Sequence, residues 1–268
     1  MPRFHRLCKI FSLTCIWITF KILIVMASFA PETIFQVGSF PITNTILHTL
    51  LVDAIIIAGV FYISKKLTLV PTNPVQNAIE SIIETFYSLT ESVAKHAASK
   101  IFPYFMSFFI FILIANWTGL IPGVGTIGIR EHGELIPIFR GTTSDLNTTL
   151  GLALVSVVAT HMLSIRTTGI KDYLSRFFSF NPINLFIGVL EIISEITKLV
   201  SLSFRLFGNI FAGEVVLFTV SSIFAFIFPL PFLLLEVIVG VVQALVFSML
   251  TMVFMAILTT SHESHRES

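Results

Sequence analysis

The sequence has few charged residues and few cysteines. Charged side chains make up 12% of the 268 residues, about half the share in an average soluble domain, whereas 55% of the residues are hydrophobic. The 16 lysines and arginines nearly balance the 15 acidic residues, so no basic field favours nucleic acid as a partner. Cys8 and Cys15 form no CxxC motif, and we assign them no redox or metal role. The composition indicates a membrane protein.

Two sequence features of other protein classes are also missing. The chain has no GxxxxGK[ST] loop, with which many proteins hold nucleotide phosphates, so we expect no ATP chemistry. We also expect no cofactor and no metal. It shows no internal repeat, which argues against a transporter built from inverted repeats.

The N-terminal residues allow three interpretations. Arg3, Arg6 and Lys9 precede an apolar stretch, as in a signal sequence, and Lys21 interrupts that stretch. A signal anchor, a cleaved signal and an interfacial helix all fit this pattern. Each of them places residues 31–43 outside or at the outer interface.

Hydropathy predicts membrane spans over 45–63 and 101–121. Each is about long enough, at ~1.5 Å per residue, for a hydrocarbon core of ~30 Å. Lys65 and Lys66 after the first span mark the inner side of the membrane. Between the spans, apolar residues recur at helical spacing over 73–100 with glutamates on other faces, which predicts an amphipathic helix on the membrane surface.

A turn-rich outer loop is predicted over 122–144. Arg130 and Arg140 lie there against the trend for positive charge on the inner side. The next span, 145–165, begins at Asp145, a favourable helix N-cap. The inner loop that follows it is basic and contains Arg166, Lys171 and Arg176.

The longest helical pattern begins at Pro182 and meets no strong breaker before Pro229. A helix of that length would be ~70 Å long, more than twice a perpendicular span. We therefore expect it to tilt steeply or to bend at Gly208 or Gly213.

A Pro-Leu-Pro turn at 229–231 predicts a return helix over 232–258, and thus an antiparallel hairpin over 182–260. We predict an all-α, polytopic membrane protein with about five transmembrane helices and one amphipathic surface helix. Its two parts are an N-terminal segment, 1–43, and a membrane domain, 44–268.

Ionisable residues inside the predicted hairpin are the candidate functional residues, because each costs roughly 2.5–3.5 kcal/mol at the centre of a membrane helix. They are Glu191, Glu195, Lys198, Arg205, Glu214 and Glu236. Heptad spacing places Glu191, Lys198 and Arg205 on one face, with Asn209 one turn further. Glu191 and Glu195 can each pair with Lys198.

Arg205 has no carboxylate partner on its own turn, since its nearest charged neighbours are Lys198 and Glu214. Its guanidinium stays protonated, so it must face a partner subunit, a polar cavity or another helix. In an antiparallel hairpin, Gln243 falls at about the depth of Arg205, and Glu236 falls near Glu214. Such a carboxylate pair has the character of a proton relay.

The C-terminal helices resemble the last two membrane helices of subunit a of the F-type ATP synthase. The stretches that carry the resemblance are ISEITKLVSLSFRLFGNIFAGEVV and LPFLLLEVIVGVVQALVFSMLT. Earlier helices of that family are similar to FMSFFIFILIANWTGLIPG and TSDLNTTLGLAL, so the resemblance runs from about Thr45 to the C-terminus. Its most specific part is the Arg-Leu-Phe-Gly-Asn motif followed by Gly-Glu.

The resemblance implies a proton path of two offset half-channels beside a rotating ring of c subunits. Arg205 would separate them, attracting the ionised carboxylate of the ring and blocking a direct passage of protons. Glu214 and Glu236 would line the outer half-channel with Asn209 and Gln243 nearby. The further lining positions are Asp145 and Asn116 near the outer mouth, Glu191 in the inner half-channel, and Lys198. Many members of the family place a histidine where Glu236 faces Glu214, so this relay should be more acidic.

The implied partners are the c-subunit ring, b-type peripheral stalk subunits, the F1 sector through the stalks, and the lipid bilayer. The basic N-terminus and lysine-rich inner loops suit a bacterial plasma membrane, with the mitochondrial inner membrane as the alternative. The functional alternatives are a self-contained ion-coupled secondary transporter, a structural membrane anchor, and a sodium-coupled version of the same subunit.

Overall fold

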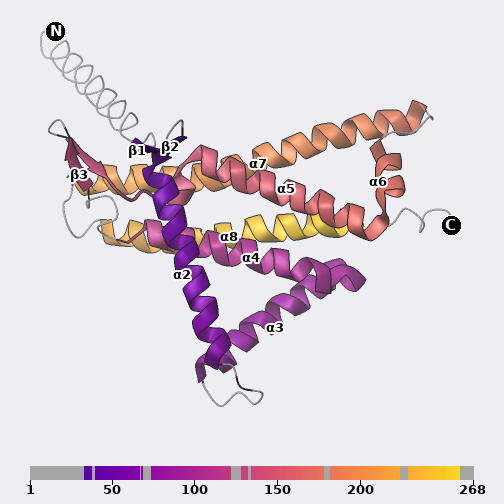
Figure 1. Ribbon diagram of the computed structural model, residues 1–268, viewed down its shortest axis with the longest axis horizontal. Helices are drawn as coiled ribbons and strands as arrows, with labels where there is room; N and C mark the ends of the chain where they lie inside the picture. The colour runs from indigo at the N-terminus through magenta and orange to yellow at the C-terminus, as the bar shows by residue number, and fades with distance from the viewer. Residues whose placement is uncertain are drawn as a thin grey trace, which may run out of the picture.

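The structure is a computed structural model that describes residues 33–37, 40–66, 68, 74–121, 128–131, 134–177, 182–223 and 229–259. Our predictions for the first 30 residues and for the polar C-terminal tail lie outside these ranges. Within them the chain is mainly helical, which confirms the predicted all-α, polytopic membrane fold (Figure 1).

Most of the helices lie close to predicted segments. Two predictions were wrong: residues 170–177 of the predicted basic inner loop are helical, and the last helix begins at Pro229, inside the predicted Pro-Leu-Pro turn. The helices are α2 (Asn44–Lys66), α3 (Pro74–Ala94), α4 (Ala98–Gly119), α5 (Leu146–Thr168), α6 (Ile170–Phe177), α7 (Pro182–Ile223) and α8 (Pro229–Thr259). Among the described residues, α2, α4, α5 and α8 are long and apolar enough to cross a membrane. The 42-residue α7 carries five ionisable residues and is not one of these four, so a fifth span stays a prediction.

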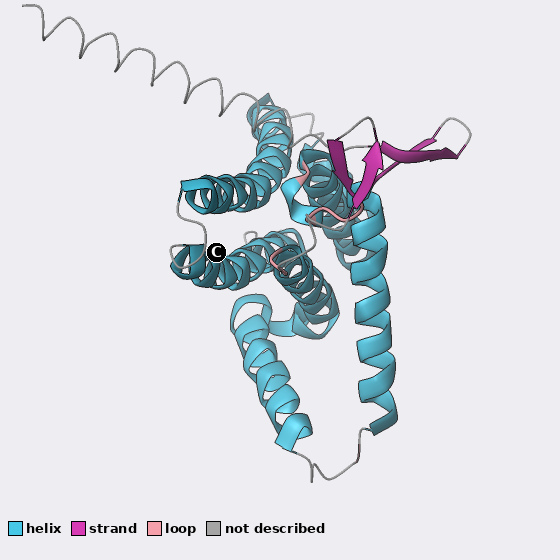
Figure 2. Cartoon of the chain, turned by 90° about the vertical axis from the view of Figure 1, so that its left-hand side faces the viewer, coloured by secondary structure: helices cyan, strands magenta, loops and turns pink. Residues whose placement is uncertain are grey.

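The outer segments contain two β-hairpins that the sequence analysis did not predict. Strands β1 (Thr33–Val37) and β2 (Phe40–Thr43) pair antiparallel, as do β3 (Gly128–Glu131) and β4 (Glu134–Pro137). Both hairpins lie near one end of α2 (Figure 2). Strands of four or five residues give too short an alternation to be recognised by periodicity, so the prediction of a turn-rich loop over 122–144 was incomplete.

The amphipathic helix ends earlier than the pattern over 73–100 predicted. A 3-10 turn, η1 (Lys95–Ala97), separates α3 from α4, and Lys95 there has a positive φ of 46°. On the buried side of α3, the ring of Phe86 packs at 5.4 Å from Phe105 and 5.0 Å from Phe109. Aromatic packing therefore holds α3 against α4.

Hydrogen bonds between small polar side chains join the packed helices. α4 lies along α8, and α5 lies against both α7 and α8. Ser156 and Thr251 are in hydrogen-bond contact at 2.8 Å, and Ser164 donates to the Leu258 carbonyl at 2.7 Å. Such contacts hold helices together in lipid, where apolar burial between helices gains little.

The two long helices, α7 and α8, run antiparallel and in contact. Asn209 on α7 bonds Gln243 on α8, and further along α7 the Glu236 carboxylate lies on Gly213. α7 is continuous through both candidate bend positions and changes direction along its length (Figure 1). The connection, 224–228, lies outside the described residues.

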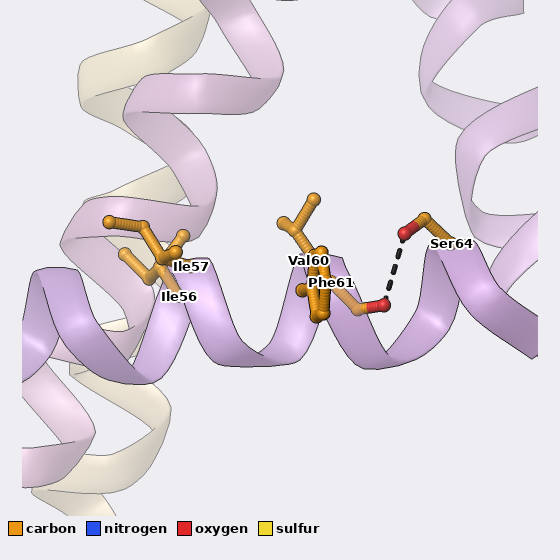
Figure 3. Close-up of a pocket in the computed structure, with 5 residues that line it drawn as sticks. All are labelled: Ile56, Ile57, Val60, Phe61 and Ser64. Carbon is orange, nitrogen blue, oxygen red and sulfur yellow. Dashed lines mark hydrogen bonds between the residues drawn. The ribbon is translucent and has the colours of Figure 1, made fainter.

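α2 crosses the packed helices steeply (Figure 1). Towards its inner end it presents a shallow apolar surface, the α2 groove, made by Ile56, Ile57, Val60, Phe61 and Ser64 (Figure 3). The Ser64 hydroxyl is satisfied by the Phe61 carbonyl at 3.0 Å, so it leaves the groove apolar. Such a surface suits lipid contact.

Candidate functional site

Arg205 lies on an open face of α7. Its side chain is exposed, and Nη2 donates to the Ser201 hydroxyl at 3.4 Å. Among the described residues, no carboxylate lies within ion-pair distance of it. On the following turn, a Cβ added to Gly208 would have nothing within 4 Å. The charge thus faces away from the helix bundle, on a surface that a second protein can approach.

The amides of Asn209 and Gln243 join the two long helices next to this charge. Asn209 Nδ2 donates to Gln243 Oε1 at 2.7 Å. Gln243 is 3% exposed, and its Nε2 has no hydrogen-bond partner among the described residues. Because Asn209 is one helical turn after Arg205, Gln243 lies at about the depth of Arg205, where the hairpin argument placed it.

The two glutamates of the outer half lie close to each other but in different surroundings. Glu236 is buried, its carboxylate packs directly on Gly213, and Oε1 has no hydrogen-bond partner among the described residues. Glu214 lies beside the Ser144 hydroxyl, which donates to the Gly141 carbonyl, and within electrostatic reach of Arg140 and Glu236. A glycine at 213 is therefore what lets α7 accommodate the carboxylate of α8.

Arg140 is a residue that the sequence analysis noted without assigning it a role. Its charge acts on Glu214 from the segment that precedes α5. The sequence feature that could have indicated a role for Arg140 was its position on the predicted outer side, against the positive-inside trend. Arg140 therefore places a positive charge within electrostatic reach of Glu214.

Asn116 and Asp145 lie near the outer glutamates but have structural partners. Asn116 accepts from Thr143 Oγ1 at 2.8 Å and donates to the Gly240 carbonyl at 3.1 Å, which joins α4 to α8. Asp145 caps α5, since Oδ1 accepts from the Asn147 N–H at 2.9 Å. The N-cap prediction for Asp145 is confirmed, so any role of this residue in a proton path would be additional to capping α5.

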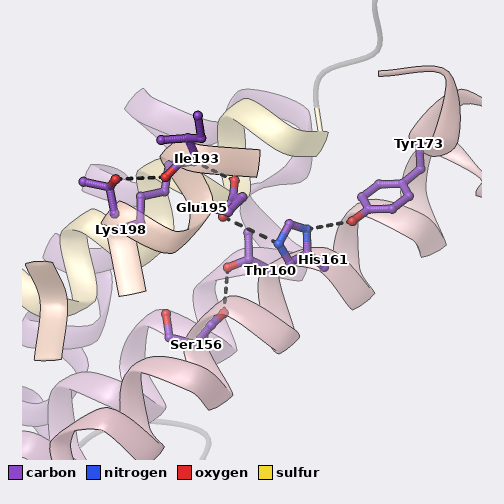
Figure 4. A network of polar contacts seen from close by, with 8 residues as sticks. Ser156, Thr160, His161, Tyr173, Ile193, Glu195 and Lys198 are labelled. Carbon is purple, nitrogen blue, oxygen red and sulfur yellow. Dashed lines mark hydrogen bonds and ion pairs between the residues drawn. The ribbon is translucent and has the colours of Figure 1, made fainter. Parts of the chain in front are cut away.

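A second polar cluster, the inner cluster, links α5, α6 and α7 (Figure 4). Lys198 Nζ bonds Glu195 Oε1 at 2.8 Å, and Glu195 Oε2 lies 3.5 Å from His161 Nε2. The opposite nitrogen of His161 contacts the Tyr173 hydroxyl at 3.0 Å. Of the two glutamates that could pair with Lys198, the structure pairs Glu195; no ion pair of Glu191 is found among the described residues.

The polar groups that meet between the long helices are suited to moving protons. Carboxylates and hydroxyls can pass protons along hydrogen bonds, amides can hold such groups in place, and a fixed guanidinium controls which carboxylates stay ionised. No group of three or more potential metal-ligating side chains occurs in the described part of the chain. Fold and site together define a polytopic membrane protein with polar and ionisable groups between its long helices.

Comparison with known families names the class more closely. The ATP synthase A chain family matches residues 46–256, and the chain belongs to this family. The resemblance found in the sequence is thereby confirmed.

Several bacterial proteins called ATP synthase subunit a are similar over most of the chain. The protein from Moorella thermoacetica is 32% identical over 237 residues, which covers 88% of this chain and 100% of the relative. Pelobacter propionicus has a protein called ATP synthase subunit a 2 that is 31% identical, covering 88% of this chain and 95% of the relative. The Legionella pneumophila strain Philadelphia 1 protein is 30% identical, covering 85% and 92% respectively.

Proposed function

We propose that this chain is the proton-translocating stator subunit of a rotary F-type ATP synthase and performs no catalysis of its own. Membership of the ATP synthase A chain family supports this assignment. The observation that carries the mechanism is the position of Arg205, a permanent charge on an exposed face of α7 with no described carboxylate within ion-pair distance. A carboxylate from a c-subunit ring is the counter-ion that this position requires.

In this proposal Arg205 separates two half-channels. As the ring turns, a protonated carboxyl group approaches the guanidinium, and the positive charge favours release of its proton into one half-channel. At ~4 Å and an effective dielectric of ~20, the attraction between the two charges is about 4 kcal/mol, enough to drive that release. The ionised carboxylate then moves past Arg205 and is protonated from the other half-channel.

Glu214 and Glu236 form the outer relay. A proton from the outer side binds one carboxylate and passes to its neighbour and then to the ring, while Arg140 favours return of Glu214 to the ionised state. Asn209 and Gln243 hold the two helices in register beside Arg205. Asp145 and Asn116 line the outer mouth, and Glu191 lines the inner half-channel with Lys198 nearby.

The remaining parts of the proposal concern the assembly. The partners are the c ring, b-type stalk subunits, the F1 sector through the stalks, and the bilayer. The bacterial sources of the relatives favour a bacterial plasma membrane. The main alternative, an ion-coupled secondary transporter, would not need the c ring for transport.

The test is ATP-driven proton uptake into inverted membrane vesicles carrying wild-type chain or Arg205→Ala. Co-purification of the c ring is checked in both, and Ser201→Ala, which removes only the 3.4 Å contact of Arg205, is the matched control. We expect Arg205→Ala to assemble and pump nothing, with Ser201→Ala near wild type. Pumping by Arg205→Ala at the wild-type rate would refute the proposal, whereas failure to assemble would favour a structural anchor. Uptake that requires sodium would indicate the sodium-coupled version.

A further inference from the structure

The buried face of α2 is polar, although the helix as a whole is apolar. Its buried residues are Asn44, Thr45, His48 and Val52, and the three polar ones lie in its outer half. Asn44 and Thr45 lie four and three residues before His48, and these spacings place both on the same side of the helix as His48. Polar groups that leave water cost free energy unless they are hydrogen-bonded, and those in membrane helices commonly mark ion or proton pathways.

His48 is the titratable member of this polar face. It is 1% exposed, and its Nδ1 lies 2.7 Å from Thr142 Oγ1, to which Thr49 also donates at 3.4 Å. The other ring nitrogen, Nε2, has no hydrogen-bond partner among the described residues. The edge of the Phe139 ring and the Thr118 backbone complete its surroundings. One nitrogen thus contacts a side-chain hydroxyl, and the other has no side-chain partner in the described part of the chain.

The partner of His48 belongs to a turn that ends at the proposed outer relay. Thr142, Thr143 and Ser144 form η2 (Thr142–Ser144), and all three are at most 2% exposed. Thr143 donates to Asn116, and Ser144, whose hydroxyl donates to the Gly141 carbonyl at 2.8 Å, lies beside the carboxylate of Glu214. The contact with His48 and the contact with Glu214 therefore lie at the two ends of one buried turn. The charged groups around this turn are Glu214, Arg140 and Asp145.

We propose that His48 carries protons between the outer side of the membrane and the hydroxyl groups that lead to Glu214. A proton bonds to Nε2, the imidazolium releases its Nδ1 proton to the Thr142 oxygen, and the Thr142 hydroxyl gives its own hydrogen to a water molecule on the path to Glu214. One proton enters as one leaves, so the ring returns to neutral. An imidazole suits this task because it exchanges protons near neutral pH through two nitrogens. The inference rests on the proposed function and adds a residue to it.

The test compares four variants by passive proton conductance of vesicles stripped of the F1 sector. His48→Gln keeps an amide able to bond Thr142 but cannot carry a proton, and His48→Phe keeps the ring volume. Thr142→Val removes the hydroxyl at almost constant volume, and Thr142→Ser retains it as the matched control. Co-purification of the c ring monitors assembly, and the rate is recorded as a function of outer pH.

We expect His48→Gln, His48→Phe and Thr142→Val to assemble and to conduct about 100-fold more slowly, the lower end of the effect of a positioned proton carrier. Thr142→Ser should conduct as wild type does. In the two variants at position 48, the rate of proton conductance should also lose the part of its dependence on outer pH that arises from the imidazole.

Wild-type conductance and pH dependence in His48→Gln would overturn the proposal and leave His48 a packing residue. If His48→Gln does not assemble, equal conductance of Thr142→Val and Thr142→Ser overturns it, and loss in Thr142→Val alone supports it. Arg205→Ala in vesicles that retain the F1 sector separates the two proposals. Normal ATP-driven pumping by Arg205→Ala refutes the stator function, whereas loss there with normal conductance in His48→Gln refutes only the role of His48.

Discussion

Asn209 and Gln243 form a 2.7 Å hydrogen bond between α7 and α8, one turn beyond Arg205. Gln243 is almost fully buried, so replacing Asn209 alone leaves a buried amide without its partner, which costs about 0.6 kcal/mol on average between membrane helices and at most about 1.7 kcal/mol. We expect Asn209→Leu to lower the free energy of unfolding of the detergent-purified chain by about this much. The double variant Asn209→Leu/Gln243→Leu should lose less than the sum of the two single variants.

A double-mutant cycle by thermal unfolding measures this coupling. Hydrogen bonds between membrane helices average only about 0.6 kcal/mol, so the coupling energy should be small. If the destabilisation of the double variant equals the sum of the two single variants, the two amides do not support each other.

The depth relationships of this hairpin could be predicted from the sequence because they follow from helix geometry alone. Counting residues from the end of α7 and from the start of α8 places Gln243 within about one turn of the depth of Arg205, and Glu236 within two residues of the depth of Glu214. Pairing among near neighbours could not be decided in that way. Glu191 and Glu195 both stand at helical spacing from Lys198, and only the packing of His161 on α5 brings Glu195 into the inner cluster.

His48 was missed for a related reason. On an apolar helix such as α2, one histidine carries no periodic signal, and its importance depends on Thr142, which lies 94 residues further along the chain. The β-hairpins were missed because their strands are too short to show alternation.

Gly213 and Gly208 allow a matched comparison on α7. A Cβ at 213 would overlap the carboxylate of Glu236, whereas a Cβ at 208 would meet open space. The end of a glutamate side chain can move, so Gly213→Ala should assemble but shift the Glu236 carboxylate away from Glu214. We expect ATP-driven proton pumping to fall in Gly213→Ala, with c-ring co-purification retained.

Gly208→Ala is the control for the backbone effect, because both substitutions replace a helical glycine. Since its side chain would point to open space in the isolated chain, it should leave the thermal stability of the purified chain intact. Equal pumping by Gly213→Ala and wild type would show that the position of the Glu236 carboxylate does not limit transport.

Asp145 has an observed role as a helix cap and a proposed role at the outer mouth, and two substitutions separate them. Asparagine is an N-cap as good as aspartate, whereas alanine loses about 1 kcal/mol at this position. We expect Asp145→Ala to unfold at lower temperature and Asp145→Asn to keep the wild-type stability. If the charge assists proton entry, Asp145→Asn should still reduce the rate of proton uptake. A wild-type rate in Asp145→Asn would limit the residue to capping α5.

The inner cluster should hold α6 against α5 and α7. His161 contacts Tyr173 of α6 with one nitrogen and Glu195 of α7 with the other, so replacing it releases both contacts. Partly exposed pairs of this kind contribute up to about 1 kcal/mol, which corresponds to a roughly fivefold change in the population of locally opened α6. We expect His161→Phe to speed tryptic cleavage after the exposed Lys171 by up to that factor in inverted vesicles, where the inner face is accessible.

Tyr173→Phe removes only the 3.0 Å contact with His161 and should give a smaller increase in the cleavage rate. If both variants are cut at the wild-type rate, the contacts in Figure 4 do not position α6, and the packing of its apolar side chains must do so instead.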